Sequence, residues 1–116
     1  MDVSIETRKA DTGVVIMDVA GRLSAGEAGL LFRGVFQRCI AEGNEKFLVN
    51  LGEVSYIDSS GLGELITSHT SLRNRGGSVK LLNPNKRIRD LLKMTKLLSI
   101  FEIFEDETTA VRSFST

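Results

Sequence analysis

The chain has 116 residues, the size of one domain, and we expect a single domain over residues 1–116. Its 15 basic and 15 acidic residues cancel, which argues against direct binding of nucleic acid, because holding a phosphate backbone needs excess positive charge. With one cysteine and one histidine, the chain has neither an internal disulfide nor a zinc site of these ligands, and we expect no metal and no cofactor. The shortage of acid and base groups argues against an enzyme.

The sequence contains no membrane-spanning or secretory signal that we can identify. No apolar run approaches the roughly 18 residues that a membrane-spanning helix needs. The first six residues, MDVSIE, have neither the basic start nor the apolar stretch of a signal peptide. We therefore expect a cytoplasmic protein without a membrane span.

The first third of the chain predicts a hairpin followed by a helix. Apolar and polar residues alternate from Val3 to Thr7, and 11–13 (Asp-Thr-Gly) is typical of a turn. The apolar stretch Val14–Ala20, closed by Gly21, predicts a second strand paired with the first. The next apolar residues have helical spacing, and we expect their side chains to be buried: Ala28, Phe32, Val35, Phe36 and Cys39.

Helices and strands alternate in the remainder. Strands are predicted at Phe47–Leu51 and Val79–Leu82, with a loop over 52–61 and a helix from Leu62 to Leu72 between them. A third helix around Ile88–Leu92, a short strand Phe101–Phe104 and a last helix from Asp106 follow. This order predicts an α/β fold: a mixed, mostly parallel sheet of about five strands with an N-terminal β-hairpin, packed against about four helices.

One loop has residues suited to a functional site. It ends in 58–63 (Asp-Ser-Ser-Gly-Leu-Gly), at the carboxyl end of a predicted parallel strand, where sites gather in open α/β sheets. Asp58 and Ser59 are suited to cap a helix, which is one interpretation of them. The other is an exposed hydroxyl at a helix start, where free N–H groups accommodate a phosphate and Gly61 and Gly63 let another backbone approach.

For several other residues the sequence allows either a structural or a binding role. His69 shares a helical face with leucines, so we expect a hydrogen-bonded, partly buried side chain rather than a ligand. Tyr56 either covers the end of the sheet or faces a partner. The basic stretch from 86 to 96 is interpreted as a solvated helix face or as a patch for an anion or an acidic partner; its basic residues are Lys86, Arg87, Arg89, Lys93 and Lys96.

The segment 54–63 (Val-Ser-Tyr-Ile-Asp-Ser-Ser-Gly-Leu-Gly) resembles the signature of STAS domains, specifically the bacterial anti-sigma factor antagonists. Further similarity lies at 21–23 (Gly-Arg-Leu), 75–77 (Arg-Gly-Gly), 91–97 and 100–104, so the resemblance covers nearly the whole chain. It implies binding to an anti-sigma factor that is also a serine kinase, with release of a sigma factor. It also implies that this kinase phosphorylates Ser59 and that a serine phosphatase reverses the modification.

The resemblance assigns partner binding to the same region. Asp58 is expected to orient Ser59 and to contact the partner, together with Ser60, Gly61 and Gly63. Many family members carry Asp after Gly-x-Leu, where this chain has Ser24, which we expect beside 58–63 on the partner-facing surface. The alternative function is an accessory or ligand-binding subunit of a transport or signalling complex.

Overall fold

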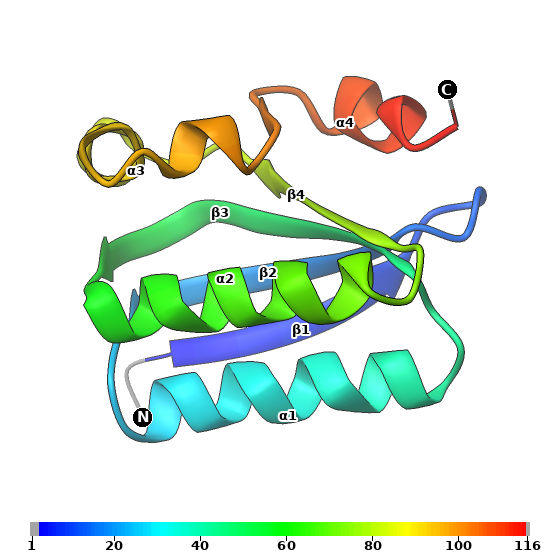
Figure 1. Cartoon of the computed structure of the whole chain (residues 1–116), viewed down its shortest axis with the longest axis horizontal. Coiled ribbons are helices and arrows are strands. Elements are labelled where there is room, and N and C mark those ends of the chain that lie inside the picture. Colours follow the sequence, from blue (N-terminus) through cyan, green and yellow to red (C-terminus); the bar gives the residue numbers. More distant parts are fainter. Residues whose placement is uncertain (1–2, 116) are drawn as a thin grey trace.

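The computed structural model describes residues 3–115 and is shown in Figure 1. Residues 1, 2 and 116, which are the two ends of the expected domain and the start of MDVSIE, therefore lie outside the described residues. In chain order the elements are β1 (Val3–Lys9), β2 (Val15–Leu23), α1 (Glu27–Ala41), β3 (Lys46–Ile57), α2 (Ser59–Arg73), β4 (Ser78–Leu82), α3 (Lys86–Met94), a 3-10 turn (Leu97–Ser99), β5 (Ile103–Phe104) and α4 (Glu107–Ser113). Within 3–115 no helix is both long and apolar enough to cross a bilayer.

The five strands form one mixed sheet in the order β1-β2-β3-β4-β5. The first pair, β1 with β2, is antiparallel, and the other three pairs are parallel. The predicted fold class is confirmed, including the N-terminal hairpin. The short strand β5 is limited to Ile103–Phe104, because Phe101 is buried in the core instead of pairing in the sheet.

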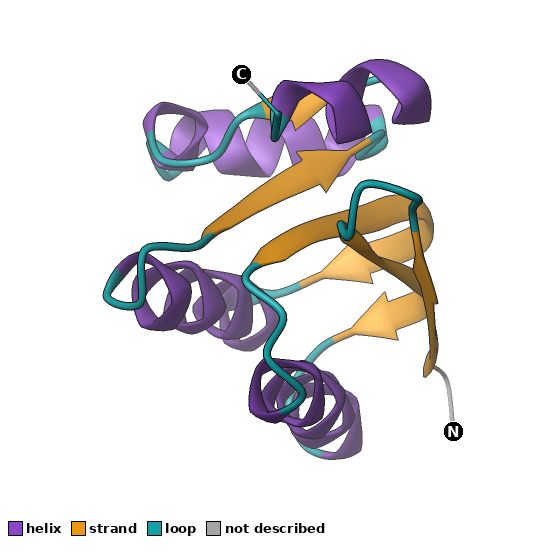
Figure 2. Ribbon diagram, turned by 90° about the vertical axis from the view of Figure 1, so that its right-hand side faces the viewer, coloured by secondary structure: helices purple, strands orange, loops and turns teal. Residues whose placement is uncertain are grey.

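Successive residues of a strand point to opposite faces of the sheet, and the two faces have separate cores. On one side, Met17 and Val49 pack with side chains of α1, α2 and α3. On the other side, Ile16 and Leu48 pack with Ala110 of α4. The layers on the two sides of the twisted sheet are visible in Figure 2. Cys39 lies in the larger core, as predicted, and burial raises the pKa of its thiol.

Two strands extend further than the sequence predicts. β2 continues past Gly21 to Leu23, and β3 continues to Ile57, through most of the predicted loop 52–61. The two strands stay paired up to Leu23 opposite Ile57, with register shifts along the way. As a result, Asp58 alone separates β3 from α2, so the start of that helix is fixed by the sheet.

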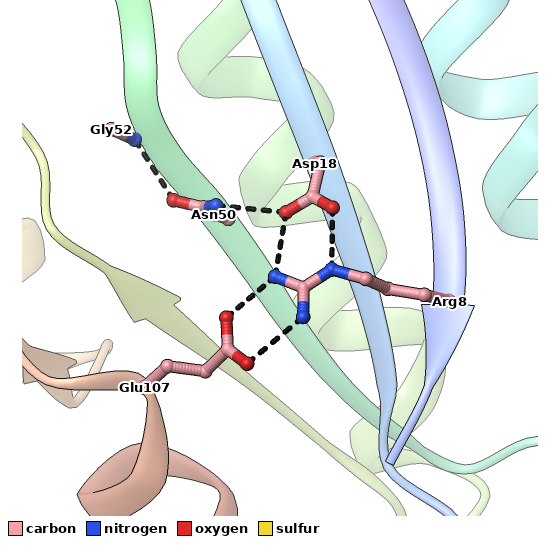
Figure 3. Close-up of polar contacts among 5 residues, drawn as sticks. All are labelled: Arg8, Asp18, Asn50, Gly52 and Glu107. Atoms are coloured by element: carbon pink, nitrogen blue, oxygen red, sulfur yellow. Dashed lines mark hydrogen bonds and ion pairs between the residues drawn. The ribbon is translucent and has the colours of Figure 1, made fainter.

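A polar network joins α4 to the N-terminal strands (Figure 3). Arg8 of β1 donates to both oxygens of Asp18, at 2.6 and 3.1 Å, and to the carboxylate of Glu107 at the start of α4. Asn50 of β3 donates to Asp18 at 2.8 Å and accepts from the backbone N–H of Gly52 at 3.0 Å. Hydrogen bonds from Arg8 hold the pKa of both carboxyl groups below their usual range.

This network predicts a pH-dependent contribution to stability. Because both carboxyl groups have lower pKa values in the folded state, the contribution is complete above their unfolded values of about 4 and is lost as the pH falls through the folded values. Arg8→Met should lower the free energy of unfolding at neutral pH by about 1 kcal/mol, a small value because solvent screens the network. It should also flatten the acid side of a plot of melting temperature against pH.

The control is Arg75→Met, which removes an exposed arginine from the turn after α2. Its melting temperature should follow that of the parent across the acid range. An unchanged acid dependence in Arg8→Met would show that the network contributes nothing to stability.

Candidate functional site

The helix α2 begins with a side-chain cap from Asp58. The Asp58 backbone is extended, its Oδ1 accepts from the N–H of Gly61 at 3.0 Å, and its carbonyl accepts from the N–H of Leu62 at 3.0 Å. Of the two residues suited to cap the helix, Asp58 therefore takes this role. The side chain of Ser59, the first residue of the helix, takes no part in capping.

Ser59 and Ser60 are both exposed at the start of α2. Within residues 3–115, neither hydroxyl forms a hydrogen bond to another side chain or to the backbone. The first turn of α2 contains no acidic residue, and a helix start carries unpaired N–H groups and a partial positive charge. A phosphate on Ser59 would therefore lie in a favourable field, opposed mainly by the carboxylate of Asp58.

The two glycines of this segment have different surroundings. Gly61 is buried, and a Cβ at this position would overlap the carbonyl oxygen of Leu23 at the end of β2. The backbone that approaches the missing side chain of Gly61 is therefore the chain's own, and contact of Gly61 with a partner stays a prediction. A Cβ on Gly63 would meet no atom within 4 Å, so Gly63 remains available to a partner.

A groove lies between the starts of α1 and α2. Ser24 and Ser60 both line it, which confirms that the segment after Gly-x-Leu lies beside the segment 58–63. Arg33 of α1 donates to Glu64 of α2 at 3.2 and 2.6 Å across the groove. The exposed side chain of Leu30 also lines it. Ser24 adds a hydroxyl, and the carboxylate of Glu64 is already held by Arg33.

On the other side of Asp58, the end of β3 faces α3. Asn85 caps α3 through the N–H of Ile88, at 2.9 Å, and its Nδ2 donates to the carbonyl of Val54 at 3.2 Å. This bond fixes the start of α3 against β3. Tyr56 is half-buried, with the guanidinium of Arg22 4.4 Å from its ring centroid, and it lines a second groove with residues of α3.

His69 differs from its predicted environment. The residue is partly buried, but its Nδ1 is buried and has no hydrogen-bond partner within the described chain. The ring packs edge-on against Phe101, with 5.2 Å between centroids. Burial lowers the pKa of the imidazole, and Arg73 lowers it further. The Nδ1 atom therefore lacks the hydrogen bond that the sequence predicts for this side chain, and one side of the ring is packed against Phe101 instead.

Several residues of this region were not singled out by the sequence. The Arg33–Glu64 pair joins two helices that are far apart in the chain, so no spacing rule could find it. Asn85 could have been identified, because an Asn that follows a proline and precedes an apolar helical pattern is a typical cap.

Comparison with known proteins places the chain in a family. The model of the STAS domain matches residues 5–110. The chain belongs to the STAS domain family. An anti-sigma-B factor antagonist of Listeria monocytogenes is 34% identical over 103 residues, covering 89% of this chain and 90% of that protein.

Solved structures show the same fold. A crystal structure of a Thermotoga maritima protein provisionally named as an anti-sigma factor antagonist has a TM-score of 0.86, with 27% identity over 97% of this chain and 95% of the other. The Bacillus cell fate determinant SpoIIAA in its phosphorylated form has a TM-score of 0.76, with 22% identity over 95% of this chain and 98% of the other. A sulfate transporter family protein of Wolinella succinogenes also has a TM-score of 0.76, with 21% identity over 88% and 84% of the two chains. The fold is therefore shared by proteins of different function.

The two glycines of this STAS domain provide a matched pair of variants. Gly61→Ala should destabilise the protein by about 1–3 kcal/mol, because the added methyl group forces β2 and α2 apart. Gly63→Ala should be neutral or should stabilise the helix by up to about 1 kcal/mol. Chemical denaturation of both variants measures the difference, and equal stabilities would contradict the assigned contact with Leu23.

Proposed function

We propose that this STAS domain is an anti-sigma factor antagonist, which binds an anti-sigma factor through the surface around Ser59 and so releases a sigma factor. The names of relatives that match most of the chain support this function. The observation that carries the proposal is the exposed Ser59, held at the first position of α2 while Asp58 caps the helix. In this function the chain is a ligand and a substrate, not a catalyst.

The binding is switched by phosphorylation of Ser59. The anti-sigma factor acts as the serine kinase, and a serine phosphatase restores the binding form. A phosphate adds about −1.5 to −2 charges and three acceptor oxygens at a helix start that favours anions, so the fold is retained. A partner packed over Ser59 would bury that charge without a counter-charge, at a cost of several kcal/mol, and each 1.4 kcal/mol weakens binding about tenfold.

The surrounding residues have separate roles in this function. Asp58 fixes the start of α2 and contributes the carboxylate beside Ser59. Ser24, Ser60 and Gly63 form the contact surface next to it, since Ser24 and Ser60 line one groove and Gly63 has open space around it. Ser24 replaces the carboxylate found in many antagonists, so the partner of this chain needs no cation opposite that position.

The first experiment determines which of the two adjacent serines is phosphorylated. Ser59→Ala should accept no phosphate from the purified anti-sigma factor kinase of the same organism and should bind it as the parent does. Ser60→Ala, the matched control, should still be phosphorylated. Ser59→Asp should bind at least about tenfold more weakly, because it places a charge under the partner. Radiolabelled ATP and titration calorimetry measure the two properties, and phosphate transfer to Ser59→Ala would assign the site to Ser60.

A second experiment distinguishes the capping role of Asp58 from the role of its negative charge in partner binding. Asn caps a helix about as well as Asp, so Asp58→Asn should leave the melting temperature nearly unchanged, whereas Asp58→Ala should cost about 1 kcal/mol of stability. Both variants should nevertheless reduce partner binding or the rate of phosphorylation several-fold. If Asp58→Asn binds and is phosphorylated as the parent is, the carboxylate has no role beyond capping.

A further inference from the structure

The exposed apolar side chains of the molecule are concentrated at the end of α3. Within the described chain the large exposed apolar residues are Leu30, Met94, Leu98 and Ile100, and three of the four fall within residues 94–100. Met94 has the greatest exposure, at 80%. Single exposed apolar residues are normal on a protein surface, but three of them within seven residues make this segment a candidate contact surface.

The fold keeps these side chains outside the core. Leu92 is buried, and Met94, two residues further along the helix, lies about 200° around it, on the solvent side. Lys96 then ends the helix in a left-handed conformation, at φ 63°, which is uncommon for a residue other than glycine. Beyond this turn Leu98 and Ile100 are 39% and 42% exposed, so the chain presents them beside the end of α3.

The same segment carries unpaired positive charge. Residues 86–96 contain five basic residues and one acidic residue, in a chain whose total charge is zero. Lys86 pairs with Asp90 at 2.9 Å, and Arg89 pairs with Glu105 at 3.5 Å. The other three basic residues form no ion pair with a carboxylate of residues 3–115: Arg87, Lys93 and Lys96. A surface of this kind is complementary to an acidic partner.

Part of this surface lies close to the segment that precedes Ser59. Met94 and Arg87 line the groove that Tyr56 and Ile57 form at the end of β3. Ile57 is followed by Asp58 and then by Ser59, and α3 and the start of α2 lie at the same end of the molecule (Figure 1). A partner that covers Ser59 therefore has the end of α3 within its reach.

We propose that the α3 patch, defined as Arg87, Lys93, Met94, Lys96, Leu98 and Ile100, is a second contact surface for the anti-sigma factor. It takes an acidic segment of that partner, whose carboxylates pair with the basic side chains and whose apolar side chains cover Met94. The proposal rests on the proposed function, and it makes the α3 patch the source of the attraction between the two proteins. An anionic membrane and a second copy of this chain are the other occupants that the test distinguishes.

The charge is tested with the double variant Arg87→Glu/Lys93→Glu, in the full chain without phosphate. Its matched control is Lys46→Glu/Arg75→Glu, which makes the same change in net charge with exposed residues at the start of β3 and after the end of α2. Titration calorimetry against the purified anti-sigma factor should show binding at least about tenfold weaker for the α3 variant, and a smaller loss of affinity between about 50 and 300 mM salt. The control should bind within about twofold of the parent, because its charges lie far from the contact.

Met94→Gln tests the contribution of the apolar side chains of the α3 patch without changing the net charge. Because Met94 is exposed, its replacement should not affect folding. It should weaken binding by about three- to tenfold, with an unchanged melting temperature. If the parent binds the anti-sigma factor and both α3 variants bind equally well, the α3 patch is not a contact surface, while the proposed function stands. If the parent itself does not bind, both proposals fail.

Two further measurements test the other occupants. The parent is sedimented with phosphatidylglycerol vesicles and is also analysed by sedimentation equilibrium. Vesicle binding that is lost in Arg87→Glu/Lys93→Glu, with anti-sigma binding intact, would overturn the proposal in favour of a membrane. A dimer of the parent that dissociates in this variant, again with anti-sigma binding intact, would overturn it in favour of self-association. We expect neither result.

Discussion

The arrangement of the site depends on the contact between the end of β2 and the start of α2. The carbonyl of Leu23 lies against Gly61, where even a methyl group would overlap it. The parallel pairing of β2 with β3 extends to Leu23 and Ile57, directly before Asp58. These two constraints fix the position of Ser59 relative to the segment that contains Ser24. Without Gly61, the strand ends and the helix start could not approach closely enough to form one surface.

A fixed scaffold determines how a modification of Ser59 can act. The cap from Asp58 and the contact at Gly61 hold the first turn of α2, and neither involves the hydroxyl of Ser59 that the proposed switch modifies. The added group therefore changes the bulk and the charge of the surface, and the fold has no need to rearrange. The network around Arg8 reinforces the scaffold on the other side of the sheet, where it joins α4 to β1 and β2.

Most of the fold was predictable from the sequence, because periodicity identifies elements whose faces differ. The failures have physical causes. The sequence predicts a strand that ends at Leu51, whereas β3 continues to Ile57. The difference arises because the register of β3 against β2 shifts twice and the regular alternation of apolar and polar residues is lost beyond Leu51. Ser59 and Ser24 were found because their segments have recognisable patterns. The close contact at Gly61 and the packing of His69 involve Leu23 and Phe101, which lie far away in the chain, so no local pattern predicts them.

The charges near Ser59 connect the switch to the α3 patch. Three carboxylates of this region are engaged within the chain: Asp58 caps α2, Glu64 is held by Arg33 and Asp90 is held by Lys86. The basic side chains of the α3 patch have no such partners among the described residues. In the proposed complex, these unpaired basic side chains attract acidic groups of the partner. In the proposed switch, a phosphate on Ser59 would oppose that attraction, in addition to its steric effect under the partner. The more acidic the partner's docking surface is, the more strongly a single phosphate weakens binding, so the α3 patch would set both the affinity and the sharpness of the switch.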